Sequence, residues 1–403
     1  MPTTLYLTRN GLLEPLGQSQ VFAYLRGLAR DYSITLITYE KDQDWADSIA
    51  VEQARAECSA LGIVWLPQRF RPTPRFVAPA ASMVAMVWLV RREVKTRGIR
   101  LLHARSYIPA TVAMVVSRMM GVPFIFDMRA LWPEELITAG RVRRGSFLHR
   151  AIVFAERECL KRSAAVVSLT EAAVQYLKIA YPDELRRRRI VVIPTCADLR
   201  RFTPPDVAPK QPVHSCIGTL LSGWFCINWL RGWIEAVAVK NPAAQFEVLT
   251  REDPVAIKAA VDPENQFAER LSIHAKRPGQ MPESVRRHSV SVMFYAGGAV
   301  SELGRSPTRM AELLGSGVPL VVNEGVGDVA KVVLENRVGV VVKGNTPGYM
   351  AEAYDALREL MNDSGLARRC RATAQAVFSL QEGVARYRDL YESVLNEDCI
   401  DCE

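Results

Sequence analysis

The segment that decides the fold class is residues 306–323, SPTRMAELLGSGVPLVVN. Ser306 is a favourable N-cap and Pro307 suits the first position of a helix, so we predict a helix that starts here. Gly315 and Gly317 end this helix just before an apolar strand, Pro319–Asn323. A short helix followed at once by a buried strand is the building unit of a sheet covered by helices.

The same unit recurs along the whole chain. Amphipathic helical stretches such as Val21–Arg30, Asp47–Leu61 and Phe147–Arg162 separate short apolar runs. The runs predicted as strands are Leu5–Thr8, Ile34–Tyr39, Ile63–Leu66, Leu101–Ala104, Phe124–Asp127, Ala165–Leu169, Ile190–Pro194, Val213–Gly218, Phe246–Leu249, Leu271–His274, Val290–Tyr295, Pro319–Asn323 and Gly339–Val342. Short apolar strands alternating with helices indicate an α/β fold with parallel sheets, helices lying on both faces of each sheet.

A proline-rich stretch divides this series into two. Residues 203–212 contain four prolines, which is typical of a linker between domains. We therefore predict an N-terminal domain over 1–203, a linker over 204–212 and a C-terminal domain over 213–380, each doubly wound and Rossmann-like. Residues 381–398 are predicted to form a final amphipathic helix, because apolar side chains recur there at helical spacing.

Composition and charge narrow the function classes. With 403 residues, 49% of them hydrophobic and 23% charged, the chain is of the soluble globular type. Residues 1–202 carry 30 basic and 18 acidic side chains, so this half favours an anionic partner. Basic clusters at Arg141–Arg144 and Arg186–Arg189 favour an anionic membrane surface; a plain solvated surface is the alternative.

Nucleic acid is not expected, because no recognition motif is present. The apolar run Val77–Val90 is too short to span a bilayer.

The start of the predicted 306–315 helix is a candidate anion site. Free amides at a helix N-terminus, together with Arg309, suit a diphosphate. Glu312 lies one turn further along, where its carboxylate could accept hydrogen bonds from ribose hydroxyls. A capped surface helix with a solvated glutamate explains the spacing equally well.

Six motifs in the same order carry a family resemblance. They are Pro15–Val21, His103–Tyr107, Phe126–Arg129 with Trp132, Ile193–Asp198, Ser306–Pro319 and Gly325–Asp328. Together they resemble retaining glycosyltransferases of family 4, in particular a bacterial branch that makes cell-surface polysaccharide.

The resemblance implies a GT-B fold, in which two Rossmann-like domains face a central cleft and the C-terminal helix packs back on the first domain. It implies a retaining transfer from a nucleotide diphosphate sugar to an acceptor such as a lipid-linked saccharide. No metal or other cofactor is expected, because the helix dipole, Arg309 and Arg251 would neutralise the leaving diphosphate. The protein would then be cytoplasmic and peripheral on the inner face of the membrane. A sugar-nucleotide 2-epimerase of the same fold and a catalytically inactive partner subunit remain alternatives.

The resemblance and the chemistry of the side chains together suggest roles for individual residues. The donor side would comprise Gly17, Gly218, Arg251, Ser306, Pro307, Thr308, Arg309 and Glu312. Near the reacting carbon would lie His103, Arg105 and Asp127, with Arg129, Trp132 and Tyr107 on the acceptor side. Asp127 is the only carboxylate among these, so it could orient or deprotonate the acceptor hydroxyl; an ion pair of Asp127 with Arg105 or Arg129 is the structural alternative.

Two features depart from the family pattern. The family carries two glutamates eight positions apart; Glu312 fits the second, whereas the first falls on Gly304, with Glu302 two residues out of register. The usual basic pair is missing from Gly218–Trp224, which leaves Arg309 and Arg251 to bind the diphosphate. Asp42 and Asp44 mimic a metal-binding motif of single-domain glycosyltransferases, but a loop of solvated acids is the preferred interpretation.

Overall fold

The chain folds into two compact units. The computed structural model describes residues 1–70, 77–206 and 211–400. The first unit comprises Met1–Pro194 together with Gly383–Glu403, and the second comprises Thr195–Glu382. The first unit therefore ends at Pro194, whereas the sequence predicted its boundary at residue 203. Linker residues 207–210 lie outside the described residues. No helix in the described ranges is long and apolar enough to cross a membrane.

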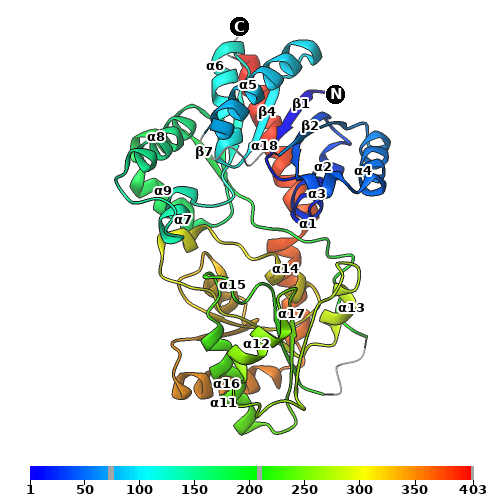
Figure 1. The fold of residues 1–403 in the computed structure, drawn as a ribbon, viewed down its shortest axis with the longest axis vertical. Helices are drawn as coiled ribbons and strands as arrows, with labels where there is room; N and C mark the ends of the chain where they lie inside the picture. The colour runs from blue at the N-terminus through cyan, green and yellow to red at the C-terminus, as the bar shows by residue number, and fades with distance from the viewer. Residues whose placement is uncertain (71–76, 207–210, 401–403) are drawn as a thin grey trace. The chain divides into compact units, whose positions relative to one another are not determined.

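The first unit is built on a parallel seven-stranded sheet of order β3-β2-β1-β4-β5-β6-β7 (Figure 1). Its strands are β1 (Thr3–Leu7), β2 (Ser33–Glu40), β3 (Val64–Arg69), β4 (Leu101–Arg105), β5 (Phe124–Asp127), β6 (Ala165–Ser168) and β7 (Arg189–Val192). Each strand overlaps its predicted range. Strands β1, β4, β5 and β6 are buried along most or all of their length, as expected where helices cover both faces of a sheet.

Helices connect these strands. They are α1 (Pro15–Gly17), the π-helix η1 (Gln18–Phe22), α2 (Ala23–Leu28), α3 (Asp42–Trp45), α4 (Ser48–Ala60), α5 (Val77–Arg97), α6 (Tyr107–Met120), α7 (Trp132–Thr138), α8 (Phe147–Arg162), α9 (Glu171–Ala180) and α10 (Pro182–Leu185). The amphipathic stretch predicted over 147–162 coincides with α8. The Ser146 side chain caps this helix by accepting a hydrogen bond from the His149 amide.

The second unit contains a parallel six-stranded sheet of order β10-β9-β8-β11-β12-β13. Its strands are β8 (Val213–Ile217), β9 (Gln245–Leu249), β10 (Leu271–His274), β11 (Val290–Met293), β12 (Leu320–Asn323) and β13 (Gly339–Val342). Its helical elements are α11 (Ile227–Lys240), α12 (Pro254–Val261), α13 (Met281–Arg286), the 3₁₀ helix η2 (Val300–Gly304), α14 (Thr308–Gly315), α15 (Val329–Glu335), α16 (Pro347–Met361) and α17 (Leu366–Phe378).

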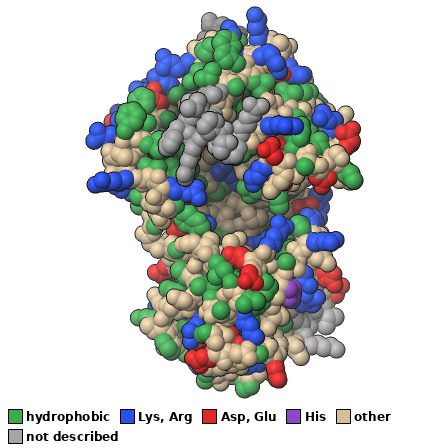
Figure 2. All heavy atoms as spheres, viewed as in Figure 1, with side chains coloured by type: hydrophobic (Ala, Val, Ile, Leu, Met, Phe, Trp, Pro, Cys, Tyr) green, Lys and Arg blue, Asp and Glu red, His purple; other side chains and the backbone are tan. Residues whose placement is uncertain are grey.

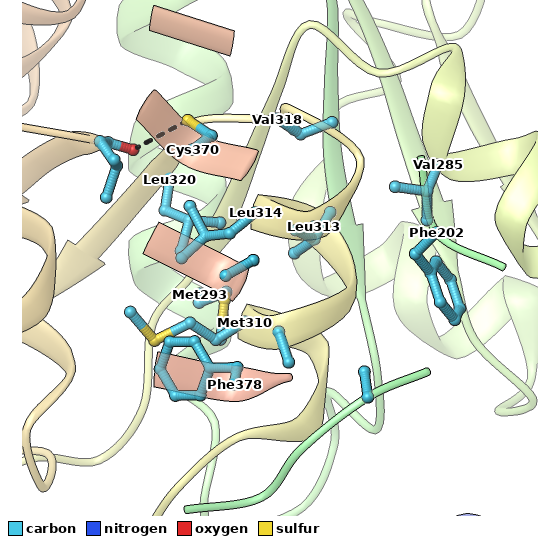
Figure 3. Packing of buried hydrophobic residues seen from close by; sticks show 14 of the residues in the cluster. Phe202, Val285, Met293, Met310, Leu313, Leu314, Val318, Leu320, Cys370 and Phe378 are labelled. Carbon is cyan, nitrogen blue, oxygen red and sulfur yellow. Dashed lines mark hydrogen bonds between the residues drawn. The ribbon is translucent and has the colours of Figure 1, made fainter. Parts of the chain in front are cut away.

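Alternating side chains of the second sheet build two separate cores. Leu320 and Val322 of β12 pack in one hydrophobic cluster, whereas Val321 between them belongs to the cluster on the opposite face. The first cluster joins β12 to α14 through Leu313 and Leu314 (Figure 3). The helix and strand of residues 306–323 thus form the packed unit that the sequence predicted.

The final helix, α18 (Leu380–Ile400), returns to the first unit. Its apolar positions lie where the spacing of residues 381–398 predicted them, since Val384, Tyr387, Leu390, Tyr391 and Val394 are all buried. Val384 packs so closely on α2 that a methyl group added at Gly27 would lie 2.6 Å from it.

Candidate functional site

The carboxyl ends of β4 and β5 bring three predicted catalytic residues together. Arg105 and Asp127 are direct partners in the parallel register of the two strands. His103 Nε2 lies 3.3 Å from Asp127 Oδ2, and Arg105 approaches the same oxygen to 3.7 Å. Arg129, two residues after β5, lies 3.7 Å from Asp127 Oδ1. The Asp127 carboxylate therefore contacts two guanidinium groups and an imidazole.

Two tyrosines of α18 complete this cluster. The Tyr387 hydroxyl donates to Asp127 Oδ2 at 3.0 Å, and the Tyr391 hydroxyl lies 2.7 Å from His103 Nδ1. Burial lowers the pKa of His103, against the opposing effect of Asp127, so the imidazole is neutral at pH 7. We assign the proton to Nε2, facing the carboxylate, so that Tyr391 donates to Nδ1.

These groups are buried, although they were expected to lie near the reacting carbon. The exposed fraction is 1% for His103, 4% for Arg105 and 0% for Asp127. Burial alone would raise the pKa of Asp127, but Arg129, His103 and Arg105 together lower it to about 2. A carboxylate with so low a pKa is a weak general base at neutral pH. The geometry therefore favours the structural ion pair over a proton-accepting role for Asp127.

The predicted acceptor-side residues Tyr107 and Trp132 contact each other beside this cluster. Their rings lie 5.5 Å apart, and the Tyr107 hydroxyl accepts a hydrogen bond from the Trp132 amide. That hydroxyl also lies 2.7 Å from the buried carboxyl of Glu156, whose pKa is raised by burial. Tyr107 thus anchors the turn between β5 and α7, a role that sequence spacing did not reveal.

The loop after β1 is held by a buried glutamate. Glu40, the last residue of β2, accepts hydrogen bonds from the amides of Leu12 and Leu13 at 2.7 and 3.2 Å. Gly17 lies against the same loop, where an added Cβ would be 1.9 Å from the Gly11 carbonyl oxygen. A packing requirement therefore accounts for Gly17, which was predicted to bring backbone amides close to phosphate.

The second unit repeats this arrangement at its own first strand. Glu252, just after β9, accepts hydrogen bonds from the amides of Leu220 and Leu221 in the loop that follows β8. Gly218 opens this loop with a φ of 149°, which glycine adopts readily. The neighbouring Arg251 is exposed and open to an anionic ligand. Sequence reasoning missed Glu40 and Glu252 because their amide partners lie about thirty residues away.

The start of α14 corrects one prediction. The helix begins at Thr308 with Pro307 as its N-cap residue, and Ser306 makes no capping bond to it. The Ser306 hydroxyl instead accepts a hydrogen bond from the Thr195 amide at 3.1 Å. Arg309 forms an ion pair with Glu312, so the two predicted donor-site side chains are partners of each other. Burial raises the pKa of Glu312, and Arg309 opposes this shift.

Glu302, next to the position where the family has its first glutamate, is not available to a ligand. Its side chain is buried and forms an ion pair with Arg305. The Arg305 guanidinium lies over the rings of Trp224 and Tyr295, at 5.1 and 5.5 Å from their centres. Trp224 lies in the segment where the family carries its basic pair. In this chain that segment therefore contributes an aromatic ring that packs on Arg305.

The two acids that mimic a metal-binding motif lie in a short helix, where a loop was expected. Asp42 and Asp44 lie in the first turn of α3, whose N-cap residue is Lys41. Over the described ranges, no three His, Cys, Asp or Glu side chains come together as metal ligands.

The two parallel α/β units define the GT-B class of fold. Residues 18–196 match the model of the glycosyl transferase 4-like domain, which covers somewhat less than half of the chain. The resemblance to family 4 glycosyltransferases and the predicted fold class are thereby confirmed. No curated protein sequence matches the chain significantly.

Solved structures similar to this chain share its fold at low identity. Sucrose-phosphate synthase from Thermosynechococcus elongatus has a TM-score of 0.72 at 14% identity, covering 98% of this chain and 100% of its own. A glycosyltransferase from Rickettsia africae has a TM-score of 0.70 at 14% identity and 98% coverage of both chains. Anabaena HepE, solved with UDP, has a TM-score of 0.66 at 14% identity, with 98% of this chain and 100% of that chain covered.

Proposed function

We propose that the protein is a retaining, metal-independent glycosyltransferase that moves a sugar from a nucleotide diphosphate sugar to a lipid-linked saccharide during cell-surface polysaccharide synthesis. The observation that carries this proposal is the glycosyl transferase 4-like domain in a chain with two Rossmann-like units. HepE has been solved with UDP and with UDP-glucose, which supports a nucleotide sugar as the donor.

The donor would bind to the second unit, at the start of α14. Glu312 would accept hydrogen bonds from the ribose hydroxyls, while Arg309 and Arg251 would bind the diphosphate. Because Arg309 and Glu312 are paired, the nucleotide has to share or replace this ion pair. Fixed cations and the helix N-terminus would stabilise the leaving diphosphate, a task for which other enzymes use a metal ion.

The acceptor would bind to the first unit. In the front-face mechanism that the resemblance implies, the acceptor oxygen bonds to the anomeric carbon as the bond from this carbon to the diphosphate breaks. The leaving phosphate then takes the acceptor's proton. The low pKa of Asp127 fits this scheme, since it calls for no protein carboxylate as the base. His103, Arg105 and Asp127 would then position the strand ends around the acceptor.

The first unit would dock on anionic lipid at the inner face of the membrane. On α8, Phe147 and Phe154 are exposed to 89% and 65%, and Arg141 and Arg143 just before it are exposed as well. Lysine and arginine side chains are scattered among hydrophobic ones over the visible face of this unit (Figure 2). Arg144, also predicted to belong to the docking surface, is paired with Glu134 and keeps 61% of its side chain exposed.

An inactive partner subunit is the second candidate. It is favoured by one observation: Gly304 stands where the family has a glutamate, and the nearby Glu302 is buried and paired.

A binding screen followed by a turnover assay tests these proposals. The melting temperature would be measured with UDP, GDP, ADP and their common sugars, since a ligand of the native state raises it. The nucleotide sugar that binds would then be incubated with a lipid-linked saccharide, and the free nucleoside diphosphate followed. Release that depends on acceptor supports the transferase. Conversion of the donor sugar without transfer supports the epimerase, and binding without any turnover supports the inactive subunit.

A further inference from the structure

The first residues of the second unit run along helix α14, where the donor is proposed to bind. At the start of the helix, the Ser306 hydroxyl accepts a hydrogen bond from the Thr195 amide at 3.1 Å. At its end, a Cβ added to Gly315 would lie 2.7 Å from the Leu199 side chain. The segment 195–202 is therefore in contact with α14 at both ends of the helix.

Arg371 of α17 fixes this segment to the end of the helix. Its guanidinium donates hydrogen bonds to the carbonyl oxygens of Leu199 at 2.9 Å and Gly315 at 2.8 Å, and also to that of Phe202. Phe202 belongs to the hydrophobic cluster that holds the buried face of α14 (Figure 3). Because Arg201 directly precedes Phe202, its backbone is held beside the last turn of α14.

The side chain of Arg201 lies near the proposed ribose-binding residue. Its guanidinium donates to the Pro278 carbonyl oxygen at 3.2 Å, in the loop after β10, and is close enough to Glu312 to lower the pKa of that carboxyl. Arg201 is exposed and forms no ion pair with a carboxylate among the described residues. The adjacent Arg200, in contrast, donates two hydrogen bonds of 2.9 Å to the carboxylate of Asp198.

The proposed donor site has a direction along α14. Arg309, which would bind the diphosphate, lies in the first turn of the helix, and Glu312, which would bind the ribose, lies one turn further along. A nucleotide is linked in the order diphosphate, ribose, base, so its base continues past Glu312 and away from the helix start. Arg201 lies on that side, since it adjoins the residue that Arg371 binds together with the end of the helix.

We propose that Arg201 binds the nucleobase of the donor and selects a base with a carbonyl group. A guanidinium carries five N–H donors and no acceptor, so it pairs with carbonyl oxygens such as those of uracil, or with O6 and N7 of guanine. Adenine carries an amino group in place of the guanine O6, and two sets of donors do not pair. The inference rests on the proposed function, in which a nucleotide sugar binds at α14. It specifies the donor as a uridine or guanosine diphosphate sugar.

The test compares nucleotides that differ in their base. Calorimetry on the full-length protein gives the affinities for UDP, GDP and ADP, in the parent, in Arg201→Gln and in the matched control Arg200→Gln. We expect the parent to prefer UDP or GDP to ADP. Arg201→Gln should weaken the preferred nucleotide roughly 5- to 150-fold and leave ADP nearly unchanged, because hydrogen bonds to the base are lost. Arg200→Gln should leave all three affinities unchanged, since Arg200 is paired with Asp198.

Inorganic pyrophosphate separates the base from the diphosphate. It carries no base, so the parent and Arg201→Gln should bind it equally. A loss of pyrophosphate affinity as large as the loss for the nucleotide assigns Arg201 to the diphosphate and overturns the proposal. A parent that prefers ADP overturns it as well, and so does a base preference that is the same in the parent and in Arg201→Gln.

Two further measurements distinguish structure and overall function from base recognition. Arg201 is exposed, so Arg201→Gln without ligand should melt close to the parent temperature. A lower melting temperature with an unchanged base preference shows a structural role and overturns the proposal. If the base preference depends on Arg201 but the turnover assay shows no sugar transfer, the proposed function fails while the assignment of Arg201 stands. Absence of binding for all three nucleotides overturns this assignment together with the donor site at α14.

Discussion

Replacing Asp127 with asparagine should destabilise the first unit strongly. The carboxylate is fully buried, lies near two guanidinium groups and accepts the Tyr387 hydroxyl of α18. Asparagine keeps the shape of the side chain but removes the charge, which leaves Arg105 and Arg129 without a counter-charge. Removing one partner of a buried ion pair costs about 3–5 kcal/mol, a large part of the roughly 5–15 kcal/mol that stabilises a typical protein.

The matched control is Asp31→Asn. Asp31 also binds α18, with its carboxylate 2.7 Å from Arg388, but this pair is exposed and should contribute about 0–1 kcal/mol. Urea unfolding of both variants at pH 7, followed by circular dichroism and tryptophan fluorescence, gives the two losses of stability. Equal unfolding midpoints for the two variants would refute the idea that Asp127 neutralises a buried charge cluster.

The Asp127→Asn substitution should also change how the stability of the protein depends on pH. In the folded protein the pKa of Asp127 is about 2, against an ordinary value of 3.8. A depressed pKa contributes stability that is fully present above pH 3.8 and is lost as the pH falls towards 2. The difference between these two pKa values corresponds to about 2 kcal/mol of folding stability. The stability gap between the parent and Asp127→Asn should therefore narrow by this amount between pH 5 and pH 2, and a constant gap would contradict the assigned ionisation.

Three further outcomes test the donor site and the docking surface. Glu312→Gln should weaken nucleotide binding roughly 10- to 150-fold in calorimetry, through loss of a charge-assisted hydrogen bond; unchanged affinity in a folded variant would remove the ribose assignment. Sugar transfer should persist in excess chelator, and its abolition would revive a metal site at Asp42 and Asp44. Replacing Arg141 and Arg143 with glutamine should weaken sedimentation with anionic liposomes at low salt; sedimentation equal to the parent's would exclude these arginines from docking.

The strands were predictable because each is a short run of apolar residues with its own local boundaries. Leu320–Asn323 and Phe124–Asp127 are buried throughout, so no partner needed to be known to place them. The helix over 147–162 was equally local, with Ser146 as its cap. The start of α14 could not be predicted from local sequence, because the Ser306 hydroxyl accepts a hydrogen bond from the distant Thr195 amide and does not cap its own helix.

The sequence picked out residues that lie together at the strand ends, but it did not reveal their contacts. Helical spacing placed Tyr387 and Tyr391 on the buried face of the last helix, yet their hydroxyls meet Asp127 and His103 far away in sequence. A periodic pattern reports which face of a helix is buried and contains no information on the polar partner. For the same reason the sequence did not reveal the ion pair between the buried Glu302 and Arg305.

The return of α18 to the first unit constrains how the protein can be synthesised. Tyr387 and Tyr391 follow their partners by 260 and 288 residues, so the ribosome makes nearly the whole second unit before either tyrosine exists. Until then the Asp127 carboxylate and the His103 ring of the nascent first unit lack their tyrosine partners. Folding from the N-terminus can therefore assemble the first sheet early, but the first unit is complete only after α18 has been made. A chain that stops at residue 382 would, for the same reason, contain every residue of the second unit and still lack the helix that completes the first.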